Sequence, residues 1–140
     1  MFLPDAHITT VALMSRHGLA GWSFAWDDST VRFGVCKYRT KTIGLSRRLV
    51  ELNGEEEVRN TILHEIAHAL APGSGHGRAW KRKALEIGAR PERCYAAKDV
   101  KAPTRKFTGR CPSCALTVAR DRRTRCACRR CHARIIWKRV

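Results

Sequence analysis

Apolar and small residues near the start of the chain recur with the period of a helix. They are Ile8, Val11, Ala12 and Ser15. Side chains three and four residues apart lie on one face of a helix. We therefore predict a helix that follows Pro4-Asp5 and ends at Gly18.

The pattern then changes to a period of two, which is typical of strands. Large apolar residues alternate with smaller or polar ones in residues 22–26 and 31–35, and the polar run 27–30 separates these segments. This arrangement predicts a β-hairpin. Residues 42–45 predict a third, weaker strand.

A short helix and a long helix are predicted after the strands. Ser46 is a candidate N-cap for a short helix that carries Leu49, Val50 and Leu52. Asn53 is followed three residues later by Glu56, which resembles a capping box for the long helix. The apolar positions of the long helix are Val58, Ile62, Leu63, Ile66, Ala67 and Leu70.

The Pro-Gly-Ser-Gly run at residues 72–75 ends the long helix. A further helix is predicted over residues 77–87, with Trp80 buried and Gly88 as its C-cap. The order of one helix, three strands and then helices predicts an α+β domain over residues 1–98.

Charge and cysteines divide the chain into two parts. The formal net charge is +16; residues 1–100 hold 15 basic and 11 acidic residues, and residues 101–140 hold 13 basic residues and one acid. Five of the seven cysteines also lie in the second part. We therefore predict a linker over residues 99–108 and a small module over residues 109–140. An excess of one sign on this scale indicates a polyanionic partner, nucleic acid before an anionic membrane.

Several classes of protein are disfavoured. The longest run of hydrophobic residues is four, whereas a membrane-spanning helix needs about 20. No basic leader precedes an apolar core at the start, so no secretory signal is visible. Cys-x-x-Cys spacing then favours metal binding in a reducing compartment over disulfides. We expect a monomer that is cytoplasmic, nucleoid-associated or otherwise intracellular, not secreted and without a membrane partner.

The predicted long helix contains the segment His64-Glu65-Ile66-Ala67-His68. Residues four apart lie on nearly one face of a helix, so His64 and His68 can bind one ion together. Glu65 is rotated by about 100° from His64, which brings its carboxylate beside the metal without making it a ligand. This pattern is typical of zinc peptidases. The alternative interpretation is two histidines on the polar face of an amphipathic helix.

A catalytic zinc takes three protein ligands and keeps one position for water. His76 follows a flexible turn after the long helix and is our candidate for the third ligand. Glu86, on the next predicted helix, is the competing candidate. Either residue could instead be an ordinary solvated side chain.

Further segments strengthen the peptidase interpretation. They are Trp22 with Trp26, Ile43-Gly44-Leu45-Ser46, residues 61–69 and His76-Gly77-x-x-Trp80. Over residues 20–95 the chain resembles the SprT-like metallopeptidase family, which includes the Spartan-type proteases that cut proteins crosslinked to DNA. The resemblance implies a zincin-like minimal metalloprotease domain with helices packed on a small three-stranded sheet. It also implies zinc on His64, His68 and His76, Glu65 as the catalytic carboxylate, and a C-terminal zinc ribbon.

Two cysteine knuckles lie in the basic module. The first knuckle contains Cys111 and Cys114, and the second contains Cys128 and Cys131. Thirteen residues separate the two knuckles. Four thiolates close a tetrahedral zinc site, so this second zinc would be structural. About 32 residues rarely fold without a metal or disulfides. Cys126 could be a zinc ligand in place of Cys128, and His132 is a further possible ligand. We favour Cys128, because two residues then separate the cysteines of the second knuckle, as they do in the first. The remaining cysteines, predicted to be free buried thiols, are Cys36 and Cys94.

Positive charge gathers in the last 21 residues. The candidate nucleic-acid-binding residues are Arg120, Arg122, Arg123, Arg125, Arg129, Arg130, Arg134, Lys138 and Arg139. A merely solvated surface usually has both signs of charge interspersed. Arginines directed at phosphates bind nucleic acid in a salt-sensitive manner without sequence preference. Trp137 is assigned to the ribbon core rather than to base stacking.

These features favour a zinc-dependent endopeptidase that acts on DNA-associated proteins and is recruited by the basic ribbon. The alternative is a non-enzymatic DNA- or RNA-binding regulator with a structural or vestigial N-terminal metal site. A nuclease is disfavoured because the candidate ligands are histidines and cysteines rather than the carboxylates that Mg²⁺ prefers. Candidate donors to the oxyanion of the peptidase reaction are Tyr38, Tyr95 and Arg78.

Overall fold

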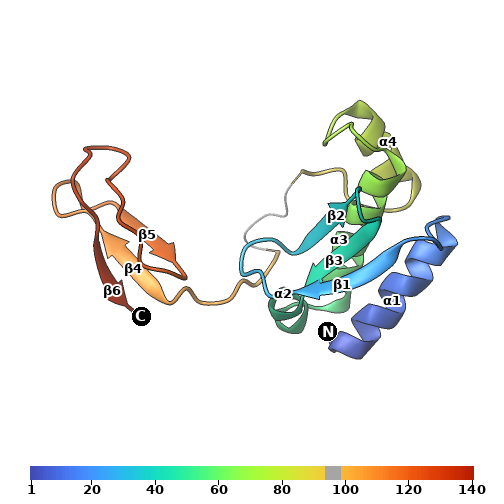
Figure 1. Cartoon of the computed structure of the whole chain (residues 1–140), viewed down its shortest axis with the longest axis horizontal. Coiled ribbons are helices and arrows are strands. Elements are labelled where there is room, and N and C mark those ends of the chain that lie inside the picture. Colours follow the sequence, from blue (N-terminus) through green and yellow to red (C-terminus); the bar gives the residue numbers. More distant parts are fainter. Residues whose placement is uncertain (94–98) are drawn as a thin grey trace. The chain divides into compact units, whose positions relative to one another are not determined.

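The computed structural model describes residues 1–93 and 99–140. They form two compact units, Met1–Pro103 and Thr104–Val140 (Figure 1). Each unit has a hydrophobic core of its own. Cys94 and the predicted end of the first domain lie outside the described residues.

Helix α1 (Leu3–Arg16) forms as predicted, but the residues whose spacing indicates the helix do not form its buried face. Ile8 is 68% exposed, whereas the buried residues lie on another stripe of the helix. They are Ala6, Thr10, Leu13 and Met14. This stripe packs against the long helix of the unit. Thr10 tolerates burial because its hydroxyl donates to the carbonyl of Ala6 (2.6 Å).

The sheet of the first unit contains β1 (Ser23–Asp27), β2 (Gly34–Lys37) and β3 (Thr42–Ser46) in the order β1-β3-β2. β1 is parallel to β3, and β2 is antiparallel to β3. The predicted hairpin between the first two strands is therefore wrong. The strand predicted to be weakest is the central one, and its residues 43–46 are all buried. A central strand covered on both faces shows a continuous apolar run instead of an alternation.

Ser46 caps helix α2 (Arg47–Leu52) as predicted. Its hydroxyl accepts a hydrogen bond from the backbone N–H of Leu49 (3.3 Å) and donates to the carbonyl of Ser29 (2.6 Å). Ser46 is thus held at the end of the central strand by two elements, which sets the direction in which α2 leaves the sheet.

Asn53 separates α2 from the long helix α3 (Glu55–Leu70). The predicted capping box is wrong, because Gly54 is the N-cap of α3. The Asn53 amide instead donates to a carbonyl of α2 (2.7 Å) and exchanges two hydrogen bonds with the backbone of Lys101 (2.8 and 2.7 Å). Residues 99–103 of the predicted linker therefore belong to the first unit.

Helix α3 forms the centre of the first unit. It packs against β2, β3, α1 and α4 (Arg78–Glu86), and Val58, Ile62 and Ile66 on its apolar face are fully buried, as their spacing predicts. In Figure 1 it runs behind the sheet, beside α4. Trp80 of α4 is fully buried as well, which confirms the predicted inner face of that helix.

The second unit is built on an antiparallel sheet. Its strands are β4 (Phe107–Arg110), β5 (Thr117–Arg120) and β6 (Ile136–Arg139) in the order β5-β4-β6. The core beside this sheet contains Cys111, Cys128 and Ile135. Across the described parts of both units, no helix is long and apolar enough to cross a membrane.

Candidate active site and metal centres

Helix α3 and the turn before α4 bring three histidines together. His64 and His68 lie one helical turn apart, and Nε2 of His76 lies 3.1 Å from Nε2 of His64 and 3.0 Å from Nε2 of His68. The ligand atoms of all three lie within 4.8 Å of one another. Glu86, the competing candidate, is an exposed residue that pairs with Lys83 (3.0 Å).

This histidine cluster could hold a metal ion. Zinc binds imidazole nitrogens at about 2.0–2.1 Å, so the edges of a tetrahedral site are roughly 3.4 Å long, close to the observed spacings. Burial, aided by the neighbouring histidines, lowers the pKa of His64 to about 4, and burial and His76 lower the pKa of His68 to about 4. Burial and then the charge of Arg93 also lower the pKa of His76. Neutral imidazoles are the form that binds metals.

One indole ring contacts all three histidines. The ring centroid of Trp80 lies 4.7 Å from those of His64 and His76 and 5.3 Å from that of His68. Its Nε1–H donates to the carbonyl of His64 (3.4 Å). The sequence predicts that Trp80 is buried, but not that it lies beneath the whole cluster, because helix periodicity says nothing about a partner on another helix.

Glu65 lies beside the histidine cluster and is only 8% exposed. The backbone N–H of Cys36 in β2 donates to its carboxylate. Burial raises the pKa of Glu65 to about 7, although the charge of Arg32 and the Cys36 hydrogen bond oppose this rise. Burial also raises the pKa of the half-buried Cys36 thiol to about 12. A buried carboxylate with a raised pKa is suited to proton transfer near neutral pH.

An open cleft of about 1060 Å³ lies over the histidines and Glu65. Its lining includes residues 31–36 and, beyond α4, Arg90 and Arg93. Tyr38 also lines the cleft, and its hydroxyl donates to the carbonyl of His68 (3.0 Å). Of the other candidate oxyanion donors, the exposed Arg78 begins α4, and Tyr95 lies outside the described residues.

Sequence reasoning missed the role of β2 at this site. Gly34 packs against Glu65 so closely that a Cβ atom at this position would lie 2.7 Å from Cγ of Glu65. A glycine inside a strand pattern is a recognised sign of a close approach. That signal is present at Gly34, but the sequence does not show which element approaches.

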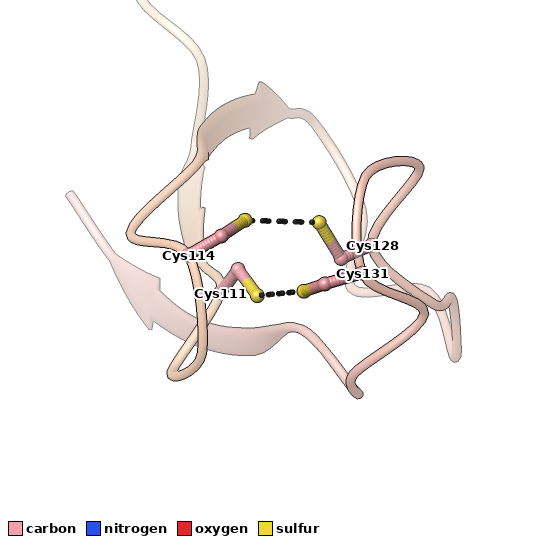
Figure 2. Close-up of side chains that lie close together, drawn as sticks. All are labelled: Cys111, Cys114, Cys128 and Cys131. Atoms are coloured by element: carbon pink, nitrogen blue, oxygen red, sulfur yellow. Dashed lines mark hydrogen bonds between the residues drawn. The ribbon is translucent and has the colours of Figure 1, made fainter.

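The second unit brings four cysteines together, as Figure 2 shows. Sγ of Cys111 lies 3.3 Å from Sγ of Cys131, and Sγ of Cys114 lies 3.5 Å from Sγ of Cys128. The cluster contains Cys128 and not Cys126, whose sulfur accepts a hydrogen bond from the Thr124 hydroxyl (3.7 Å). Four sulfurs at this spacing could hold a tetrahedrally coordinated metal.

The two knuckles of this cluster have the same backbone geometry. The residue after each second cysteine has a positive φ, Ala115 at 57° and His132 at 60°. Its N–H donates to the carbonyl of the first cysteine of the knuckle, at 3.1 and 2.9 Å. Backbone N–H donors also lower the pKa of Cys128, and that of Cys131 to about 6. At Cys114 the backbone hydrogen bond from Leu116 lowers the pKa, but the hydrogen bond with Cys128 and burial outweigh it and raise the pKa to about 12. Low thiol pKa values favour the thiolate, which is the metal ligand.

The nine predicted nucleic-acid-binding residues are all exposed on the second unit. Arg123 lies over the ring of Phe107 (5.1 Å to the centroid). Trp137 is half-buried; its ring packs over Gly109 and its Nε1–H donates to the carbonyl of Thr124 (2.8 Å). Trp137 therefore belongs to the ribbon core, as predicted.

Comparison with known proteins places this fold and site in a family. The SprT-like family model matches residues 10–104. The protein named SprT-like from Geobacillus kaustophilus (strain HTA426) is 34% identical over 106 residues, which is 69% of this chain and 70% of that protein. The crystal structure of the metallopeptidase zymogen of Methanocaldococcus jannaschii jannalysin has the same fold, with a TM-score of 0.53 and 17% identity over 68% of this chain and 86% of that chain. The chain belongs to the SprT-like family.

Proposed function

We propose that this protein is a zinc-dependent endopeptidase that cleaves proteins associated with DNA. The observation that carries the proposal is the buried carboxylate of Glu65 beside three histidines at an open cleft. A structural metal site needs no such carboxylate, whereas peptide hydrolysis needs a group that takes and returns a proton. One chain supplies the histidines and the carboxylate of this site, so the proposed reaction needs no residue from a second subunit.

Zinc held by His64, His68 and His76 would polarise the scissile carbonyl and activate a water. Glu65 would take the proton of the attacking water and deliver it to the departing amine. The backbone hydrogen bond from Cys36 would help to orient the carboxylate for both transfers. Trp80 keeps the histidine rings in place.

The edge strand β2 offers a binding surface for the substrate chain. It pairs with β3 on one side only, and its residues line the cleft. An extended peptide can add to such an edge through backbone hydrogen bonds that do not depend on side-chain identity. This mode of binding suits an endopeptidase with low sequence selectivity.

The basic ribbon would select the substrates by location. Its exposed arginines and lysines suit a phosphate backbone. A second zinc on the four cysteines would hold the small unit together. Tethering to DNA raises the effective concentration of peptidase near other DNA-bound proteins. DNA binding would thus determine which proteins are cleaved, and the cleft itself would not need to select particular substrate sequences.

The test is proteolysis of a DNA-bound protein by the wild-type chain and by Glu65→Gln, with single-stranded DNA, double-stranded DNA or no DNA. We expect DNA-stimulated cleavage by the wild type and cleavage slower by about a hundredfold or more by the variant, with the zinc content unchanged. Cleavage by Glu65→Gln at the wild-type rate would refute the mechanism. A wild-type chain that binds DNA and zinc but cleaves nothing would support the non-enzymatic regulator instead.

A further inference from the structure

Strand β2 passes directly over Glu65 at Gly34. A Cβ atom added to Gly34 would lie 2.7 Å from Cγ and 2.9 Å from Oε1 of Glu65, and 2.9 Å from Cγ2 of Thr61. Non-bonded carbon atoms prefer a separation of about 3.5–4.0 Å. The side chain of Glu65 therefore fills the place that a side chain at position 34 would take.

The need for glycine at this position is steric and not conformational. The φ of Gly34 lies outside the left-handed region that favours glycine, and Gly34 pairs with Leu45 as a regular strand residue. In such a backbone, alanine is ordinarily the better strand residue, because glycine loses more conformational freedom on folding. The contact with Glu65 outweighs this preference.

We propose that Gly34 is a positioning residue for Glu65, an inference that rests on the proposed peptidase function. The bare backbone at Gly34 lets the side chain of Glu65 approach β2 closely, within reach of the Cys36 N–H. A methyl group at this position would push Cγ of Glu65, and the carboxylate that it bears, away from the strand by about 1 Å. Displacements of this size in a catalytic group cost about a hundredfold in rate.

Gly34→Ala tests this assignment through steady-state kinetics. We expect kcat to fall by about 10–100-fold, with KM within about twofold of the wild type. The zinc content should not change, because the nearest atoms to the added methyl belong to Glu65 and Thr61 rather than to the histidines. The matched control is Gly44→Ala in β3, where the added Cβ would meet Cγ1 of Val35 (2.8 Å) and not Glu65. This control should keep kcat within about threefold.

A double-mutant cycle with Glu65→Ala adds a readout that does not depend on activity. In the zinc-loaded full chain, Gly34→Ala should lower the Tm by roughly 5 °C. In the Glu65→Ala background the methyl enters the vacated space, so the same change should lower the Tm by less than about 2 °C.

The outcomes separate this inference from the proposed function. Equal Tm losses in both backgrounds, or an unchanged kcat for Gly34→Ala, would overturn the role of Gly34 and leave the peptidase proposal standing. A wild-type chain that cleaves nothing but shows the coupled Tm shifts would refute the peptidase proposal and still support the steric assignment of Gly34. A fall in kcat together with coupled Tm shifts would support both.

Discussion

Replacing Trp80 with phenylalanine should lower the metal affinity of the three-histidine site, although no metal-binding side chain is changed. The indole ring is fully buried and contacts all three histidine rings at centroid distances of 4.7–5.3 Å. Phenylalanine keeps an aromatic face but removes about a third of the ring atoms and the Nε1–H donor. The histidine rings then lose part of the surface that holds them in one orientation.

The size of the effect follows from the burial of Trp80 and its contacts. The lost apolar contact in a fully buried position costs about 1–2 kcal/mol of unfolding free energy in the metal-free protein. Groups that orient metal-bound histidines change metal affinity by about 10–100-fold when they are substituted. Because an aromatic ring remains in Trp80→Phe, we expect an effect at the lower end of this range. The zinc affinity should fall about tenfold, which corresponds to about 1.4 kcal/mol of binding free energy.

The assay is a competition for zinc between the full chain and a chromophoric chelator. The four-cysteine site serves as an internal reference, since its affinity should be the same in the wild type and in Trp80→Phe. Trp26→Phe is the matched control, because Trp26 is half-buried in β1 and packs against Phe24 (4.8 Å). An unchanged zinc affinity in Trp80→Phe, or an equal loss in Trp26→Phe, would refute the orienting role of the indole ring.

Three further predictions concern the cysteines and the charges. Cys128→Ser should abolish the second zinc and unfold the ribbon, whereas Cys126→Ser should keep two zinc ions per chain by elemental analysis, because only Cys128 lies in the sulfur cluster. Arg122→Ala with Arg125→Ala should reduce the slope of log affinity for double-stranded DNA against log salt by about 1.8, if both side chains contact phosphates. Cys36 should react with iodoacetamide at pH 8 at least about a hundredfold more slowly than a free cysteine, because a pKa of about 12 leaves little thiolate. Its rate, followed by mass spectrometry, should rise about tenfold per pH unit.

The grouping of the candidate metal ligands could be predicted because it follows from short-range geometry. A spacing of four residues in a helix brings His64 and His68 together whatever surrounds the helix. The turn at residues 71–75 is short, so His76 cannot move far from the end of that helix. The two-residue spacing within each cysteine knuckle likewise favours Cys128 over Cys126 as a ligand. In the structure the four-sulfur cluster contains Cys128 and not Cys126.

The partners of each element could not be predicted, because they depend on distant parts of the chain. The alternation in β1 and β2 indicates strands, but the strand between them in space, β3, follows both in the sequence. The stripe of α1 that contains Ile8 is as apolar as the stripe that is buried, and the packing of α1 on α3 decides between them. The contact of Gly34 with Glu65 joins two elements in the same way.

The separation of charge between the two units has a physical reason. Binding a dication to neutral histidines, and holding a carboxylate with a pKa of about 7, requires a site without a large excess of positive charge. A strong positive potential would weaken zinc binding and lower the pKa of Glu65, as the single charge of Arg32 already does in part. Binding to a phosphate backbone requires the opposite, many exposed cations that displace counterions. Residues 1–103 of the first unit have a net charge of +5 and residues 104–140 of the second unit have +11, so the proposed metal site and the proposed nucleic-acid-binding surface lie in units of very different charge.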